Sequence, residues 1–307
     1  MVGYPADTSA QFSSRHAAHL SDLAYDFYGQ RIATCSADHL IKVWGKSAPG
    51  QQWTVRSTIE GRNTFNRITW AHPEFGQILA ACSSDYNVVI YEEIVEGNEE
   101  ESQWIERARL VDSHGEVQAL EFGPRHLGLQ LATLGEDGIC RIYEAVDMMQ
   151  MSLWPIRDEF NVSSKGSGPS STSSLSWNTS QFQQPQIVIG CLDLAQIWQY
   201  SSEHRRWLQI CELSSGGSSA ITDVSWAPSL ARSFDLIAVS FTGSDTTIYE
   251  VKSPAHVTQT WTIPAQCCRL SWNLTGTSLA TSSSDGTVQI WHKSADGKWV
   301  CSQTVDY

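Results

Sequence analysis

The stretch from Cys268 to Lys293, CRLSWNLTGTSLATSSSDGTVQIWHK, decides the fold of this 307-residue chain. It contains three short hydrophobic strands separated by two turns rich in Gly, Ser and Asn, which is typical of a β-meander. The first strand ends at Trp272, the second turn carries Asp285, and the third strand reaches Trp291 six residues after that Asp. This pattern predicts three neighbouring antiparallel strands.

The same pattern occurs six times along the chain. The aromatic residues that end the first strand of each unit are Tyr25, Trp70, Phe122, Trp177, Trp226 and Trp272. The aromatic residues of the third strand are Trp44, Tyr91, Tyr143, Trp198, Tyr249 and Trp291. Members of this second set lie 47, 52, 55, 51 and 42 residues apart, the period of a β-propeller blade. The sequence therefore predicts an all-β, six-bladed propeller over residues 20–307, with a fourth, outer strand in each blade.

An Asp precedes the second aromatic residue by six positions in four units, and these residues are Asp38, Asp85, Asp137 and Asp285. We interpret them as structural, because Asp caps tight turns through hydrogen bonds to the backbone and to a Ser two residues earlier. In WD-type blades a His links this Asp to the aromatic side chain, and we expect only His19 or His114 to lie where that His is needed. The network is therefore predicted to be largely lost. Units four and five are shorter at this turn, so Asp193 and Asp245 are expected to differ.

Composition and motifs argue against chemistry in this chain. The net charge is −13, which disfavours direct binding to nucleic-acid phosphates. The acidic run EEIVEGNEEE, residues 92–101, is interpreted as a solvated loop, with a docking site for a basic partner as the alternative. His72 and Glu74 form a conceivable acid–base pair, for which turn capping is the preferred interpretation. We predict no enzyme, no cofactor, and no catalytic or metal-binding residues.

The cysteines and the hydropathy pattern predict a soluble protein of a reducing compartment, without membrane insertion. The eight Cys include no CxxC pair. We expect Cys35 and Cys82 to be buried inside strands, and the adjacent Cys267 and Cys268 to point to opposite faces of one strand. The Ser- and Gly-rich residues 163–174 are predicted to be an inter-blade loop.

The number of blades raises the question of how the ring closes. Unit six has its own outer strand, KWVCSQTV, and residues 1–19 are too few for a further blade. Either the ring closes with six blades, or it stays open and accepts a seventh blade from elsewhere.

Several long strings resemble the Sec-thirteen/Seh family of WD-repeat nuclear pore and coat scaffold proteins. They are YDFYGQRIATCSADHLIKVW, WAHPEFGQILAACSSD, HLGLQLATLGEDGICRIYEA, SWAPS and SWNLTGTSLATSSSDG. The resemblance extends from about Leu20 to His292, and the strings IYEE and HLGLQLATLGEDG favour the Seh branch. One departure is that no second aromatic residue is followed by Asp, so the WD dipeptide is absent.

The resemblance implies an open six-bladed propeller that an α-helical scaffold nucleoporin completes by inserting a β-blade. It implies a place in the Y-shaped subcomplex of the nuclear pore, at the nuclear envelope. For the Seh branch it also implies a larger multi-protein coat at the vacuolar or lysosomal surface that regulates TOR signalling. We expect Gln11 to Ala17 to form the outer strand of the shared seventh blade. The expected partner-binding residues are Gln11, Phe12, Ser13, Ser14, Arg15, Trp44, Trp291 and Trp299.

Two other functions remain open at this point. One is a COPII-type vesicle coat subunit, the role of the Sec-thirteen branch. The other is a self-closed propeller that reads a peptide, as in ubiquitin-ligase adaptors. An open ring would separate the second alternative from the scaffold role.

Overall fold

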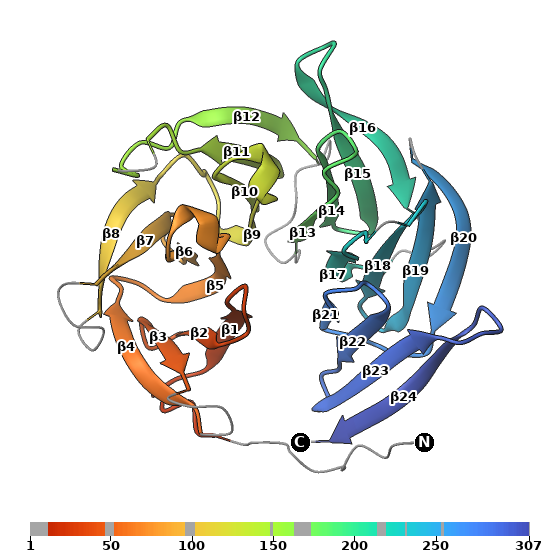
Figure 1. Ribbon diagram of the computed structural model, residues 1–307, viewed down its shortest axis with the longest axis horizontal. Helices are drawn as coiled ribbons and strands as arrows, with labels where there is room; N and C mark the ends of the chain where they lie inside the picture. The colour runs from red at the N-terminus through yellow and green to blue at the C-terminus, as the bar shows by residue number, and fades with distance from the viewer. Residues whose placement is uncertain are drawn as a thin grey trace.

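The computed structural model describes residues 12–46, 52–95, 102–147, 150–162, 173–213, 219–230, 232–252 and 255–306. These residues form six antiparallel sheets of four strands each, arranged as blades around a central axis (Figure 1). Within each blade the strands follow the order of the sequence from the axis to the outer rim (Figure 1). The predicted all-β, six-bladed propeller is confirmed.

The blades are numbered in chain order, so that β1 to β4 form blade one and β21 to β24 form blade six. The axial strands are β1 (Leu20–Tyr25), β5 (Phe65–Trp70), β9 (Val117–Phe122), β13 (Ser173–Trp177), β17 (Ile221–Trp226) and β21 (Arg269–Trp272). The second strands are β2 (Arg31–Ser36), β6 (Ile78–Ser83), β10 (Gln130–Gly135), β14 (Gln186–Cys191), β18 (Asp235–Phe241) and β22 (Ser278–Ser282). The third strands are β3 (Leu40–Gly45), β7 (Val88–Val95), β11 (Ile139–Glu144), β15 (Leu194–Ser201), β19 (Ser244–Lys252) and β23 (Thr287–Lys293). The outer strands are β4 (Thr54–Glu60), β8 (Ser102–Leu110), β12 (Ile156–Asn161), β16 (Arg206–Leu213), β20 (His256–Ile263) and β24 (Trp299–Asp306). Two short 3₁₀ helices, η1 (Pro73–Phe75) and η2 (Arg125–Leu127), follow β5 and β9.

The two aromatic positions of the repeat fall at equivalent places in every blade. The first is the last residue of each axial strand. The second lies on the third strand opposite an aliphatic residue of the second strand, as Trp44 lies opposite Ile32 and Trp291 opposite Leu279. All six aromatic residues of the third strands are buried. A large ring at this position fills the wedge-shaped space between two sheets that splay apart from the axis.

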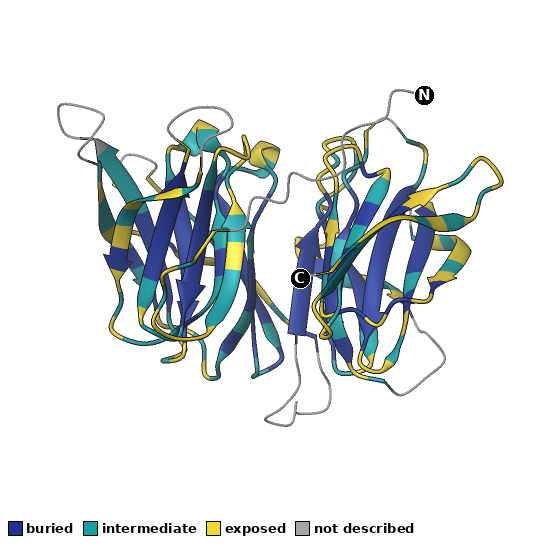
Figure 2. Ribbon diagram, turned by 90° about the horizontal axis from the view of Figure 1, so that it is seen from below, coloured by how far each residue is buried: buried dark blue, intermediate teal, exposed yellow. Residues whose placement is uncertain are grey.

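The hydrophobic core lies between the blades. Five clusters of buried side chains fill the junctions from blade one to two, two to three, three to four, four to five, and five to six. Figure 2 shows the resulting buried bands inside the stacked sheets, with exposed residues at the turns. Among the described residues, none of these clusters joins blade six to blade one. The ring is therefore open at that junction.

The shorter turns predicted for blades four and five are confirmed. In blade four Leu192 and Asp193 connect β14 to β15, and in blade five Thr242 and Gly243 connect β18 to β19. Leu192 and Gly243 have φ values of 57° and 68°, the left-handed conformation that two-residue hairpin turns require. As a result Asp245 lies inside β19 and not in the turn.

Two predicted loops begin or end differently in the structure. Glu92 and Glu93 of the acidic run belong to β7, because their strand continues past the turn expected there. Glu92 accepts a hydrogen bond from Arg107 Nε on β8 at 2.6 Å, so this part of the run is paired. The loop expected to continue through residue 174 stops before Ser173, where β13 begins. Residues 96–101 and 163–172 lie outside the described residues.

The cysteines behave as expected. Cys35 and Cys82 are fully buried in β2 and β6, and all eight cysteines are free. Cys267 is buried whereas Cys268 is exposed, as expected for opposite faces of an extended segment. Burial raises the pKa of the Cys82 thiol to about 12, which keeps it protonated. These cysteines therefore act as small core residues.

Candidate functional site: the opening between blades one and six

The face of blade six that borders the opening is uncovered. In blades one to five, one aliphatic pair joins the second and third strands on the face toward the next blade, and each member is at most 1% exposed. These pairs are Ala33–Val43, Ala80–Ile90, Ala132–Ile142, Val188–Ile197 and Ala238–Ile248. The equivalent pair of blade six is Ala280–Ile290, and both residues are partly exposed. The only difference between these sites is the missing neighbour, so blade six presents an unpaired core surface.

The face of blade one that borders the opening is uncovered near the axis. Leu23 is 56% exposed, whereas the equivalent residues of the other five blades are 3–9% exposed. Those residues are Ile68, Leu120, Leu175, Val224 and Leu270. Tyr25, the first aromatic residue of blade one, is also 56% exposed, whereas Trp177 and Trp226 are buried. Both sides of the opening thus carry side chains that are core residues elsewhere in the ring.

The outer part of the blade-one face is covered by the chain itself. Phe12 lies against Trp44 and Trp53, with ring centroids 5.1 and 6.2 Å apart. Tyr25 approaches Trp53 edge-on at 6.2 Å, so the four rings form a continuous aromatic surface. Lys42 Nζ donates to the Arg15 carbonyl, which holds the segment against β3. Residues 12–19 form no strand.

His16 completes a buried hydrogen-bond network in blade one. Its Nδ1 lies 2.9 Å from Asp38 Oδ2, and its Nε2 lies 2.9 Å from Thr34 Oγ1. Trp44 Nε1 donates to the same Thr34 Oγ1 at 2.9 Å, and the His16 side chain is fully buried. The expectation that this network is largely lost is therefore wrong for blade one, and the His expected at position 19 stands at position 16.

The carboxylate of Asp38 is stabilised by several donors. Burial alone would raise the pKa of Asp38, but hydrogen bonds from the Ala17 N–H, from His16 and from the Leu40 N–H hold it at about 2. Asp38 stays ionised at neutral pH, where it accepts from Ala17 N at 2.9 Å and Leu40 N at 3.2 Å. The N-terminal segment and the turn between β2 and β3 are therefore joined through one charged group.

A spacing rule could have identified His16 from the sequence. It precedes Asp38 by 22 residues, and the same spacing from Asp85 leads to Asn63, whose side chain hydrogen-bonds Asp85 in blade two. In blade three this spacing leads to Gly115, and the residue before it supplies a main-chain donor. His114 N lies 3.4 Å from Asp137 Oδ2.

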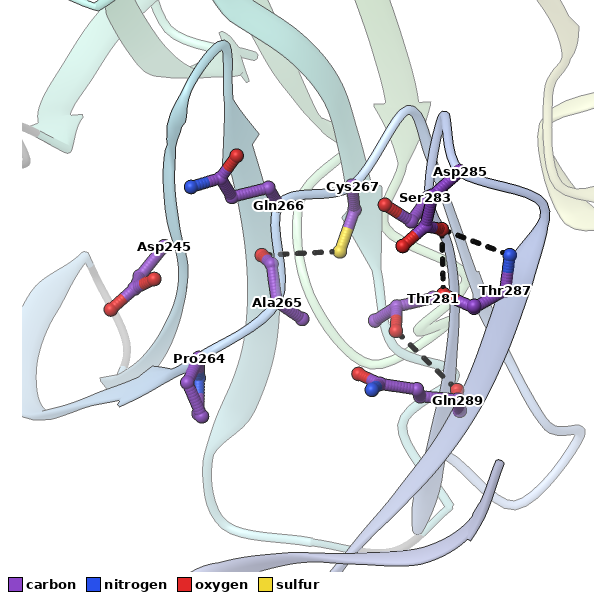
Figure 3. Close-up of a pocket in the computed structure, with 10 residues that line it drawn as sticks. All are labelled: Asp245, Pro264, Ala265, Gln266, Cys267, Thr281, Ser283, Asp285, Thr287 and Gln289. Atoms are coloured by element: carbon purple, nitrogen blue, oxygen red, sulfur yellow. Dashed lines mark hydrogen bonds between the residues drawn. The ribbon is translucent and has the colours of Figure 1, made fainter. Parts of the chain in front are cut away.

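Blade six keeps only part of the network. Trp291 Nε1 donates to Thr281 Oγ1 at 3.2 Å, as in blade one. Asp285, however, caps its own turn through the Thr287 N–H at 3.0 Å and the Thr287 hydroxyl at 2.8 Å. Thr281 and Asp285 line a polar hollow of about 300 Å³ together with Asp245 and neighbouring residues (Figure 3). Both Thr281 and Asp285 thus have hydrogen-bond partners within blade six itself.

The axial strands are joined to one another through side chains. Asp22 on β1 accepts from Ile68 N at 3.2 Å, and Asp223 on β17 accepts from Leu270 N at 2.8 Å. Across the opening Asp22 also pairs with Arg269 on β21. This ion pair is the contact that spans blades six and one at the axis, where the channel between the axial strands has a volume of about 240 Å³.

Burial shifts the acids of this channel toward their neutral forms. It raises the pKa of Glu121 to about 8, although Trp177 N donates to Glu121 Oε2 at 3.1 Å. Burial likewise raises the pKa values of Asp22 and Asp223, against the charge of Arg67. These acids act as main-chain acceptors that hold the inner strands together.

Comparisons with known proteins agree with the repeat. The family described as "WD domain, G-beta repeat" matches residues 9–45, which include β1 to β3 of blade one, and residues 256–292, which include β20 of blade five and the inner strands of blade six. Nucleoporin SEH1-A of Xenopus laevis is 37% identical over 319 residues, covering 93% of this chain and 85% of that protein. The chain belongs to the SEH1 nucleoporin family. Nucleoporin SEH1 of Homo sapiens is 36% identical, covering 94% of this chain and 85% of its own length, and that of Danio rerio is 35% identical, with 94% and 84%.

The structure places the expected partner-binding residues of this SEH1-family chain in different surroundings. Trp291 and Trp299 lie in the cluster between blades five and six, so they do not line the opening. Trp44 faces the opening, but Phe12 covers it. Ser13, Ser14 and Arg15 belong to the segment that runs across blade one, and Gln11 lies outside the described residues. The alternation of strand side chains could have identified Ile290, next to Trp291, because adjacent residues point to opposite faces.

His72 has a structural role in this SEH1-family chain. His72 Nδ1 accepts from Glu74 N at 3.2 Å and caps η1, as its preferred interpretation required. Within the described ranges no group of three or more His, Cys, Asp or Glu side chains could hold a metal ion. No helix found in those ranges has the length and apolar character needed to span a membrane.

Proposed function

We propose that this protein is a structural scaffold subunit of the nuclear pore, within the Y-shaped subcomplex at the nuclear envelope, and performs no catalysis. Its open ring accepts a β-blade from an α-helical scaffold nucleoporin. The observation that carries the proposal is the exposed core pair Ala280–Ile290, which faces the exposed Leu23 and Tyr25 across the opening. Membership of the SEH1 nucleoporin family supports the assembly in which this contact is made.

The energetics favour a permanent partner. Two apolar blade faces together bury on the order of 1,000 Å² or more when a sheet is inserted, the size of a stable protein interface. At about 25 cal/mol per Å² this burial is a large driving force, whereas leaving it open favours aggregation. The same opening would serve the vacuolar or lysosomal coat that regulates TOR signalling. The two assemblies differ in the helical subunit that co-purifies.

The test compares the chain with an Ile290→Glu variant in native cells. We expect the tagged wild-type chain to give a nuclear rim and to co-purify with a helical nucleoporin in equal amounts. Ile290→Glu should lose both, because a carboxylate would be buried against the inserted sheet. The matched control is Leu274→Glu, an 82% exposed residue in a turn of the same blade, which should behave like wild type. A wild-type chain that is diffuse, or that marks vesicle exit sites, contradicts the proposal.

The N-terminal segment is proposed to add the outer strand of the completed blade. His16 is anchored in blade one, so Ser13 to Ala17 act as the connection that leads into β1. Deleting residues 1–11 keeps His16 and should weaken partner binding at least tenfold without lowering the melting temperature of the chain. Unchanged affinity would contradict this part of the proposal.

A further inference from the structure

Three of the five closed junctions follow one hydrogen-bonding rule at the axis. The acceptor is the side chain three residues before the first aromatic residue of one blade. The donor is the main-chain N–H two residues before the first aromatic residue of the next blade. Asp22, Ser174 and Asp223 do so, with Ile68 N at 3.2 Å, Val224 N at 3.3 Å and Leu270 N at 2.8 Å. These contacts keep neighbouring axial strands parallel and in step.

A second acceptor lies one position before the first aromatic residue. Glu121 accepts from Trp177 N at 3.1 Å, and Ser176 accepts from Trp226 N at 3.2 Å. At both acceptor positions the acceptor is a hydroxyl or carboxylate side chain, and the donor is a main-chain N–H of the next axial strand. In these blades, main-chain N–H groups of the axial strand are therefore satisfied by side chains of the blade before it.

The aromatic residue itself adds a contact in the other direction. Trp70, Trp177 and Trp272 each donate Nε1 to a main-chain carbonyl of the preceding axial strand. The acceptors are Ala24 O at 3.1 Å, Glu121 O at 3.2 Å and Ser225 O at 3.1 Å. Each acceptor is the residue just before the preceding aromatic position. The equivalent carbonyl on the blade-six side of the opening belongs to Ser271.

Blade six does not follow this rule on the side that faces the opening. Its residue three positions before Trp272 is Arg269, which has only donors. Blade two has Arg67 at the same position, and Arg67 Nε donates to the Gln118 main-chain carbonyl of blade three at 3.0 Å. Arg269 therefore matches a main-chain carbonyl of a following strand. In the open ring its guanidinium reaches Asp22 instead.

We propose that the opening is specific for one more axial strand, parallel to β21, with Trp at the aromatic position and Ser, Thr, Asp or Glu one and three residues before it. The Trp would donate to Ser271 O, Arg269 would donate to the main chain of this strand, and the two acceptors would receive the N–H groups of Leu23 and Tyr25. This inference rests on the proposed blade insertion and adds the chemistry of the inserted strand.

The probe is a copy of the chain's own blade four, which satisfies the rule. Residues 173–213 supply Ser174, Ser176 and Trp177, and they are joined through a flexible Gly-Ser linker after residue 306. Hydrogen exchange of β1 is then compared with that of the unfused chain. The expected result is at least tenfold slower exchange of the Tyr25 N–H. The melting temperature should also rise.

Two matched variants are placed in the copy alone. Ser174→Val with Ser176→Val keeps strand propensity and removes both acceptors, and should return Tyr25 N–H exchange to that of the unfused chain. Trp177→Phe should slow exchange less than the unaltered copy. Equal protection by the valine copy, or no protection by the unaltered copy, overturns the inference.

The proposed function is judged separately. The unfused chain should still mark the nuclear rim even if the strand rule fails. A fusion that closes the ring should lose the nuclear rim, because the blade site is then filled.

Discussion

The two edges of the opening are built from the same repeat but are prepared differently. On blade one, Phe12 and His16 cover the outer half of the face, and only Leu23 and Tyr25 near the axis stay exposed. Among the described residues, the equivalent surface around Ile290 on blade six has no such cover. The difference indicates that blade one is stabilised by its own chain, whereas blade six depends on what fills the opening.

The largest effect should separate a closed junction from the open edge. Ile248→Ala in blade five removes a fully buried side chain and should cost about 2–5 kcal/mol of unfolding free energy. Ile290→Ala, at the same register position in blade six, should cost under about 1 kcal/mol, because its side chain is already partly hydrated. Urea denaturation of both variants measures the contrast. Equal losses would mean that blade six is covered in solution.

The next effect concerns the anchor of the N-terminal segment. His16→Ala removes the hydrogen bonds of His16 to Asp38 and Thr34, which keep their other partners, and should cost about 1–3 kcal/mol. It should also release Phe12, raising the exposure of Trp44 to a fluorescence quencher. His19→Ala is the matched control, since the His19 side chain takes no part in the hydrogen bonds described for this network, and should change stability little. A silent His16→Ala would show that blade one does not need its cover.

A pH series tests the burial of the axial acids at the closed junctions, which contrasts with the exposure of the open edge. The folded-state pKa of Glu121, about 8, lies above its ordinary value of 4.5. The folded chain therefore binds the proton more tightly, and stability should fall as pH rises from 4.5 to 8, by at most about 1.4 kcal/mol per pH unit. Glu121→Gln should flatten this slope. An unchanged slope in the variant would assign the dependence to other groups.

The smallest effect concerns Phe12 alone. Phe12→Ala removes its contact with Trp44 and Trp53 and should cost about 0.5–1.5 kcal/mol. The measurement is thermal unfolding, with Phe182→Ala as the control, because Phe182 is 89% exposed. If both substitutions cost the same, the aromatic surface on blade one adds nothing to the stability of the chain.

The sequence predicted the architecture better than the site. Spacing of aromatic residues predicts the blades because Trp44 and its equivalents must fill the same wedge in each. The open ring was implied by the family resemblance, since strand counting alone left a closed six-bladed ring as the alternative. The contact residues could not be predicted, since Trp291, expected to bind the partner, lies toward blade five. Burial of a side chain depends on which neighbour its face meets. Ile290 and Ile248 are the same residue type at the same register position, and only the three-dimensional structure shows that Ile290 is partly exposed and Ile248 is buried.

The exposed pair Ala280–Ile290 also bears on how long the protein survives in a cell. A partner that binds only the folded ring stabilises it by mass action, so the fraction unfolded depends on the ratio of the two subunits. Copies made in excess would keep an apolar face open to chaperones and proteases and would be degraded first. An opening filled by such a partner would therefore match the abundance of the chain to that of its assembly.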